Sequence, residues 1–305
     1  MRKLLLLFFV CFVVLTASSQ QDPQFSQNMF NKLANNPGYA GSHGAINAQI
    51  LHRSQWIGFG EDGGAAISTQ NFSVDAAIPI LNGGVGLNIV KDDNGPFSNL
   101  GLQASYAYRT DLGIGQVGIG TSIGIYQTGL DGSGFKFSDD GDQRIPLGSV
   151  SGSALDLGAG VYYNTRDVYI GLSTAHINQP TIEYDKGSVA LVRHYFLLTG
   201  YYYQLNEALS LNPSMYLKAG GGVSQLDINT NLIYNNQLWS GVTYRLDEGL
   251  VFLGGMNITK DLRAGVAYDI VLSELKDNSF EFMLGYQFNI DYEKPVSKYK
   301  NPRFL

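Results

Sequence analysis

The chain has 305 residues, of which 15% are charged and 12% are aromatic, and its formal net charge is −6. The charged fraction lies well below the roughly 25% of an average soluble domain, and the acidic balance argues against nucleic acid as a partner. The single cysteine, Cys11, lies in the leader described next, so the mature chain is expected to hold neither a disulfide nor a cysteine-ligated metal.

Residues 1–19 have the pattern of a secretory signal peptide. A basic pair, Arg2 and Lys3, precedes an apolar run from Leu4 to Leu15, and the small residues Ala17 and Ser19 follow. This order predicts cleavage after Ser19 and export from the cytoplasm. Removal of the leader leaves 18 basic residues against 26 acidic ones, so the mature net charge is −8.

Residues 20–45 form an N-terminal segment that we expect to be a periplasmic or plug element. Asp22 followed by Pro23 is typical of a helix start, and a helix is predicted from Pro23 to about Ala34. Its apolar face would carry Phe25, Met29, Phe30 and Leu33. Two interpretations stay open: a plug or docking element, and a segment packed under a barrel rim for stability.

Residues 46–290 alternate between apolar and polar positions without a break in composition. One such row is Leu100, Leu102, Ala104, Tyr106 and Tyr108, and another is Val117, Ile119, Thr121, Ile123 and Ile125. A strand with one face in lipid and the other in a wet lumen must alternate in this way. Segments of about 9 to 11 residues are long enough to cross a membrane as tilted strands. We therefore predict an all-β, 14-stranded antiparallel outer-membrane barrel, with a soluble β-sandwich or propeller as the structural alternative.

The connections between these segments are expected to alternate in length. Tight turns are predicted at Pro79–Asn82, Asp111–Ile114, Thr165–Asp167, Asn206–Glu207, Asn235–Asn236 and Thr259–Asp261. Longer joints are predicted at Ser54–Gly64, Lys91–Pro96, Thr128–Ser153, Gln179–Val192 and Ser273–Asn278, with a short exception at Asp247–Gly249. Outer-membrane barrels keep short turns in the periplasm and long loops outside. Both termini should therefore be periplasmic.

Four arginines of the predicted strands could bind a partner or hold the barrel interior together. Arg53, with Gln55 and Trp56, lies where the first strand leaves the membrane on the outer side. A guanidinium beside an indole could bind a carboxylate or aromatic group of a partner, or these residues could hold the interior together. The same two interpretations apply to the lumen-directed Arg109, Arg245 and Arg263.

No pattern in the chain predicts an enzyme, a cofactor or a metal site. The acidic residues of the longest outer loop could bind calcium, but a solvated loop explains them as well: Asp131, Asp139, Asp140 and Asp142. A G-x-G-x-x-G match at Gly113 lies at a turn between strands, with no helix to bind pyrophosphate. The four histidines, His43, His52, His176 and His194, are scattered in the sequence and show no carboxylate or nucleophile pattern.

Residues 291–305 form a periplasmic C-terminal tail beyond the last strand. The tail has four basic residues, Lys294, Lys298, Lys300 and Arg303, and two acidic ones, Asp291 and Glu293. Its net charge is therefore about +2 on an acidic protein. It could dock a periplasmic partner, or it could pack on the rim as an assembly signal. Deletion of residues 294–305 should spare insertion but weaken export in the first case, and abolish insertion in the second.

Four motifs, at Gln20–Gln27, Asn36–Gly41, Arg53–Trp56 and Asn301–Leu305, bracket the mature chain. In this order they resemble the PorP/SprF family of type IX secretion system membrane proteins, although Gly38 stands where the family more often has Ala. The resemblance implies an outer-membrane barrel without enzymatic activity. We expect partner-binding positions within the motifs: Phe25, Asn36, Pro37, Gly41, Arg53, Gln55, Trp56, Pro302, Arg303 and Phe304.

The partners that the resemblance implies are type IX periplasmic and outer-membrane components and a secreted cargo protein or its C-terminal domain. The bilayer is the other expected partner. The competing function is a solute-specific porin or a hydrophobic-compound transporter, which would share the leader, strands and loops but would have an open lumen.

Overall fold

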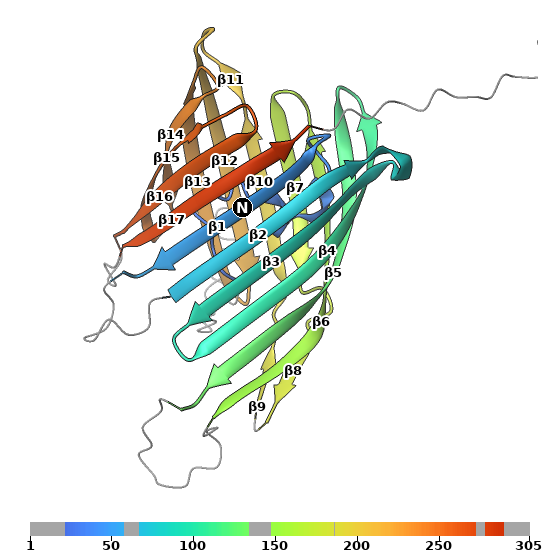
Figure 1. The fold of residues 1–305 in the computed structure, drawn as a ribbon, viewed down its shortest axis with the longest axis vertical. Helices are drawn as coiled ribbons and strands as arrows, with labels where there is room; N and C mark the ends of the chain where they lie inside the picture. The colour runs from blue at the N-terminus through green and yellow to red at the C-terminus, as the bar shows by residue number, and fades with distance from the viewer. Residues whose placement is uncertain (1–21, 58–66, 134–147, 186, 273–277, 290–305) are drawn as a thin grey trace, which may run out of the picture.

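The computed structural model describes residues 22–57, 67–133, 148–185, 187–272 and 278–289. Within these ranges the chain forms a closed antiparallel barrel of 14 strands (Figure 1). The barrel strands are β1 (Ile46–Gln55), β2 (Ile67–Ile78), β3 (Gly83–Asn94), β4 (Phe97–Leu112), β5 (Gly115–Asp131), β6 (Ser149–Asn164), β7 (Val168–Ala175), β10 (His194–Tyr201), β12 (Leu209–Gly220), β13 (Val223–Tyr234), β14 (Leu238–Arg245), β15 (Gly249–Asn257), β16 (Leu262–Val271) and β17 (Ser279–Phe288). The predicted fold and strand number are confirmed.

The barrel closes where the first and last strands meet. β1 pairs antiparallel with β17, with Ile46 opposite Phe288, and β10 pairs with β12 across a second seam. Short β11 (Tyr203–Gln204) extends the pairing of β12, while β8 (Thr181–Tyr184) and β9 (Gly187–Ala190) form a separate hairpin. Closure gives every barrel strand two neighbours, as a sheet in hydrocarbon requires.

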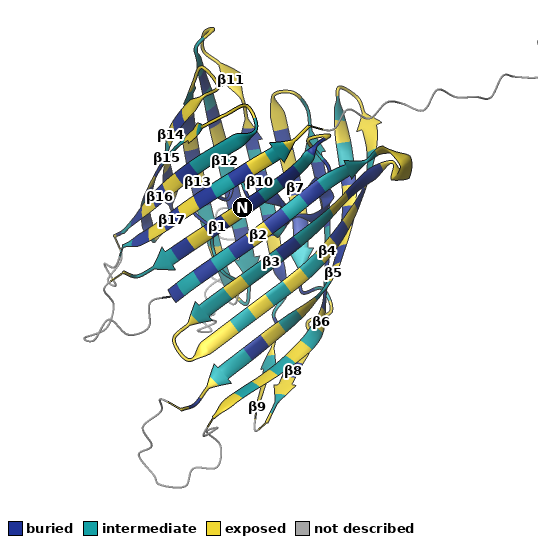
Figure 2. Ribbon diagram, viewed as in Figure 1, coloured by how far each residue is buried: buried dark blue, intermediate teal, exposed yellow. Residues whose placement is uncertain are grey.

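Buried and exposed residues alternate along the strands (Figure 2), as expected when successive side chains point to opposite faces of the wall. On β5, Ile119, Ile123 and Ile125 are exposed on the outer face. On β1, by contrast, the inward positions include the polar Asn47, Gln49 and Arg53, all of which are buried. The predicted lipid-facing rows thus form the outer surface, and the polar rows face a filled interior. Among the residues that the structure describes, no helix is long and apolar enough to cross a membrane.

Connections at the end of the barrel where β1 begins are short, as predicted, and none exceeds four residues between consecutive strands. The other end is less uniform than expected. Lys91–Pro96 is not a long joint, because β3 continues to Asn94, β4 restarts at Phe97 and these two residues pair. The Gly221–Gly222 turn at this end is equally short, and both of its glycines have positive φ.

We call residues 22–45 the plug, and its stretch from Asp22 to Gly41 contacts inward-facing residues of the barrel wall. The first described residue of the plug, Asp22, contacts side chains at the end of β7 and the start of β10, far from the end where β1 begins. The plug therefore runs along the lumen, away from the end at which the sequence placed the N-terminus.

The predicted helix from Pro23 to Ala34 is wrong. The structure has turns at 26–30, a four-residue helix α2 (Lys32–Asn35) and a 3-10 turn η1 (Pro37–Tyr39). The apolar residues expected on one face are divided, because Leu33 joins one core cluster and Met29 another on the opposite side. A segment surrounded by the barrel wall can pack its apolar side chains against strands on every side. It therefore does not need the single apolar stripe of an amphipathic helix.

Candidate functional site

A buried charged network joins the plug to the barrel wall. The guanidinium of Arg53 donates to the Asp269 carboxylate at 2.6 Å and to Ser26 Oγ at 2.6 Å, and it lies 3.5 Å from Glu281. The backbone amides of Ser26 and Gln27 donate to the two oxygens of Glu281 at 2.7 and 2.8 Å. The hydrogen-bond acceptor of these two amides is thus a carboxylate of the wall and not a helical carbonyl. Arg53 thus holds the interior together, the second of its two predicted roles.

A second arginine extends this network. Arg245 is 1% exposed and contacts Asp227 and Asp269 at 3.3 Å, and it also donates to Ser26 Oγ at 3.3 Å. Ser26 Oγ in turn donates to Asp269. A buried charge without a partner is costly, so the network gives the plug one well-defined seat against five strands: β1, β13, β14, β16 and β17.

Amide side chains continue these contacts on the neighbouring strands β2 and β3, and further round the wall on β6. Asn31 donates to Asn71 at 2.9 Å, and Asn71 donates to Asn88 at 2.7 Å. Further along, Asn36 donates to the Val161 carbonyl at 3.0 Å and accepts from Gly38 N at 2.8 Å. Asn36, one of the predicted partner-binding residues, is fully buried and binds the chain's own wall.

Glycines of the wall make room for the predicted motif at residues 36–41. A Cβ on Gly120 would lie 2.5 Å from the backbone of Pro37, and one on Gly118 would lie 2.3 Å from Gly38 O. Gly38 itself has no positive φ, but a Cβ there would lie 2.9 Å from the Gly118 and Gly160 carbonyls. Close backbone packing, and not unusual backbone angles, therefore explains glycine at position 38.

Gly41 has a different reason to be glycine. Its φ is +71°, and its amide donates to the Asp75 carboxylate at 2.8 Å. A Cβ there would also lie 2.7 Å from Gly84. Left-handed backbone angles and close approach together favour glycine.

Lys32 is a buried plug cation outside the membrane-spanning strands. Its ammonium lies 3.6 Å above the Tyr169 ring and 5.9 Å from the Tyr39 ring. Burial, and then the positive charge of Arg263, lower the pKa of Lys32 to about 7. The ring faces offset part of the cost of burying this charge.

The remaining predicted positions divide into three groups. Phe25 and Pro37 are buried in the plug, and Gln55 and Trp56 are half-buried at the end of β1, where Trp56 N donates to Ser279 Oγ at 3.3 Å. Pro302, Arg303 and Phe304 lie outside the described residues, as does the tail around them. Two arginines expected in the lumen lie there against the plug: Arg109 donates to Gly38 O, and Arg263 lies over the Phe30 ring.

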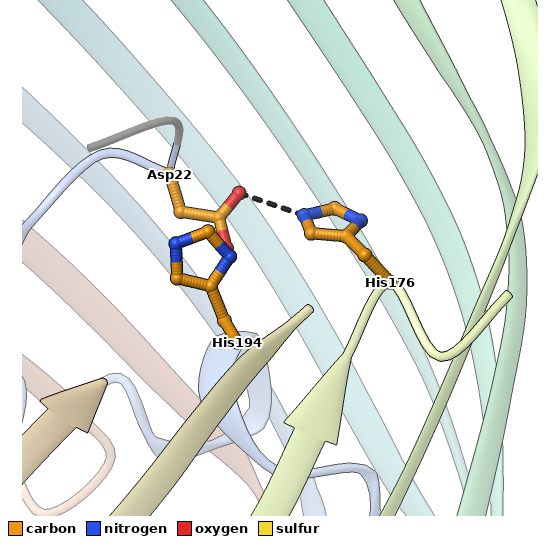
Figure 3. Close-up of side chains that lie close together, drawn as sticks. All are labelled: Asp22, His176 and His194. Atoms are coloured by element: carbon orange, nitrogen blue, oxygen red, sulfur yellow. Dashed lines mark hydrogen bonds and ion pairs between the residues drawn. The ribbon is translucent and has the colours of Figure 1, made fainter. Parts of the chain in front are cut away.

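Two histidines expected to stand apart from carboxylates meet acidic groups in the lumen (Figure 3). His176 Nε2 lies 3.0 Å from Asp22 Oδ1, and His176 Nδ1 lies 2.8 Å from Asp156 Oδ1. His194 Nδ1 lies 3.5 Å from Asp22 Oδ2. Burial by itself lowers the pKa of His176, but the carboxylates of Asp22 and Asp156 outweigh it and raise this pKa to about 10.

These features define an outer-membrane type of β-barrel whose lumen holds its own N-terminal segment. The family model of the type IX secretion system membrane protein PorP/SprF matches residues 17–286. The chain belongs to this family, as its terminal motifs indicated, and it is accordingly an outer-membrane component of type IX secretion.

The chain also matches solved structures at low identity, each with a TM-score below 0.5. The Ralstonia pickettii toluene transporter TbuX matches with a TM-score of 0.48 at 14% identity, covering 85% of this chain and 93% of that one. The TodX deltaS2S3 mutant monoaromatic hydrocarbon channel matches with a TM-score of 0.47 at 15% identity, covering 90% and 96%. The translocator domain of the autotransporter NalP from Neisseria meningitidis gives 0.43 at 13%, covering 81% and 88%. No curated protein matches the sequence.

Proposed function

We propose that this barrel is a platform of the type IX secretion and gliding machinery. It binds periplasmic components and helps to export a secreted cargo protein or to retain it at the cell surface. One observation supports this best: the lumen holds the chain's own residues 22–41, anchored by Arg53, Asp269 and Glu281. A barrel filled in this way suits binding at its two ends and its outer wall.

The proposed orientation places the end with short turns, where β1 begins and β17 ends, in the periplasm. In this orientation Phe288, the last residue of β17, lies at the end of the barrel that faces the periplasmic components. The basic residues 294–305 are then the candidate docking tail on an otherwise acidic protein. We place the signal cleavage after Ser19 on the leader pattern alone.

A crosslinked pull-down of the tagged protein from native outer membranes tests the platform function. Mass spectrometry should recover type IX components or a large secreted protein. Deletion of residues 294–305 should keep the folded barrel in the membrane and lose those partners, whereas lost insertion would make the tail an assembly signal.

The competing function is transport of a small solute. A cavity beside the plug favours it, because it is lined by both apolar and polar side chains, including Phe25, Tyr126, Phe196, Asn88 and Gln103. Recovery of the barrel without partners, together with passage of a solute through reconstituted protein, would overturn the platform function in favour of a transporter.

A further inference from the structure

We infer that Asp22, His176 and His194 form a binding site for one divalent transition-metal cation of the zinc type, which clasps the plug to the barrel wall. The three ligand atoms, one from each residue, lie within 4.8 Å of one another. Tetrahedral ligands at zinc bond lengths of about 2.0 to 2.2 Å stand about 3.4 Å apart. His176 Nε2 lies 3.0 Å from Asp22 Oδ1 and His194 Nδ1 lies 3.5 Å from Asp22 Oδ2, so each imidazole approaches a different oxygen of the same carboxylate at a distance close to this value.

The environment of His176 is that of a metal-ligating histidine. Its Nδ1 faces Asp156 Oδ1 at 2.8 Å, and the other oxygen of Asp156 accepts from Gln103 at 2.7 Å. A carboxylate that holds one ring nitrogen turns the other toward a metal and raises its basicity. Nε2 of His176 accordingly points at Asp22 (Figure 3).

His194 provides an independent observation. Its side chain is 2% exposed, and Nδ1 is aimed at Asp22 Oδ2 from 3.5 Å. A cation held by Asp22 and His176 would take Nδ1 as its second imidazole ligand.

The charges around the three ligands also suit a divalent cation. Lys218 donates to the main-chain oxygen of Asp22 at 2.5 Å, and Asp92 lines the same cavity as Asp22 and His176. With neutral histidines, the three carboxylates of Asp22, Asp92 and Asp156 exceed the single charge of Lys218 by two. One divalent ion makes this group neutral, and its nitrogen and oxygen donors are those preferred by zinc and its neighbours.

Calorimetric titration of the EDTA-stripped, mature, detergent-folded protein with Zn²⁺ tests the site. We expect one ion per chain, and binding weakened by about tenfold or more in H194A and D156N. The matched controls are H52A, on the outer face of β1, and H43A, in the plug beside Tyr39. Both controls should bind as the wild type does.

X-ray absorption at the zinc edge of the wild type needs no variant and remains informative if H194A fails to fold. The expected first shell holds two imidazole nitrogens and carboxylate oxygen. No stoichiometric binding, a shell without imidazole, or binding that is lost in H52A and kept in H194A would overturn the site and leave the three residues as an ion-pair cluster. None of these outcomes bears on the platform function.

Discussion

Arg53 of β1 and Asp269 of β16 meet at 2.6 Å inside the barrel, although β17 lies between their strands. The plug contacts this pair from the lumen side: Ser26 Oγ accepts a hydrogen bond from Arg53 and donates one to Asp269. The ion pair and Ser26 therefore link three segments that are distant in sequence. Because both the wall and the plug take part in these contacts, a substitution in either should destabilise the packing of the other.

Removal of the Arg53 charge should destabilise the folded barrel strongly. In R53M the buried carboxylates of Asp269 and Glu281 lose their nearest cation, and breaking a buried pair in this way costs about 3–5 kcal/mol. Urea unfolding of the vesicle-inserted protein measures the loss. R166M, at an exposed turn, is the matched control and should stay close to wild type. Equal stability of R53M and wild type would mean that the network does not hold the plug.

Deletion of residues 22–41 should open the lumen. The wild type in a planar bilayer should conduct little, because these residues fill the barrel, whereas the deleted form should show discrete open-channel steps. Wild-type conductance as large as that of the deleted form would contradict a filled lumen and favour the porin alternative.

A methyl group at Gly120 should disturb the plug, whereas one at Gly129 of the same strand should be tolerated. The added Cβ would lie 2.5 Å from Pro37 at position 120, but 3.5 Å from its nearest neighbour at position 129. Overpacking of this kind costs about 1–3 kcal/mol. We expect G120A to melt earlier than G129A in the same detergent, and the reverse order would contradict the close seat of the plug.

Lys32 should make plug stability depend on pH. Its folded pKa of about 7 lies below the ordinary lysine value, so its protonation opposes the folded state. The free energy of unfolding is therefore highest above the unfolded pKa near 10.5, where Lys32 is neutral in both states. It falls as the pH drops through the folded pKa of about 7. K32M should therefore gain stability over wild type at pH 6, and the gain should shrink toward pH 10. Thermal melts of the two proteins across this range measure the difference, and a gap that does not change with pH would exclude the mechanism.

The alternation along residues 46–290 predicted the strand number and the face of each row without any tertiary information. The prediction succeeded because successive side chains of a membrane strand face lipid and lumen in turn. This period of two can be read from neighbouring residues alone. Even the lumen-directed Arg109, Arg245 and Arg263 were placed correctly by this rule. The terminal motifs likewise identified the family.

Only the tertiary structure decided what the lumen residues contact. Ser26 and Glu281 are separated by 255 positions, and Asp22 and His176 by 154, so no local pattern relates them. The predicted helix failed for the same reason, since the wall supplies the hydrogen-bond partners that a free segment would have found in its own backbone. Local periodicity thus determined the wall of this protein, and closure of the barrel around its own N-terminal segment determined the interior.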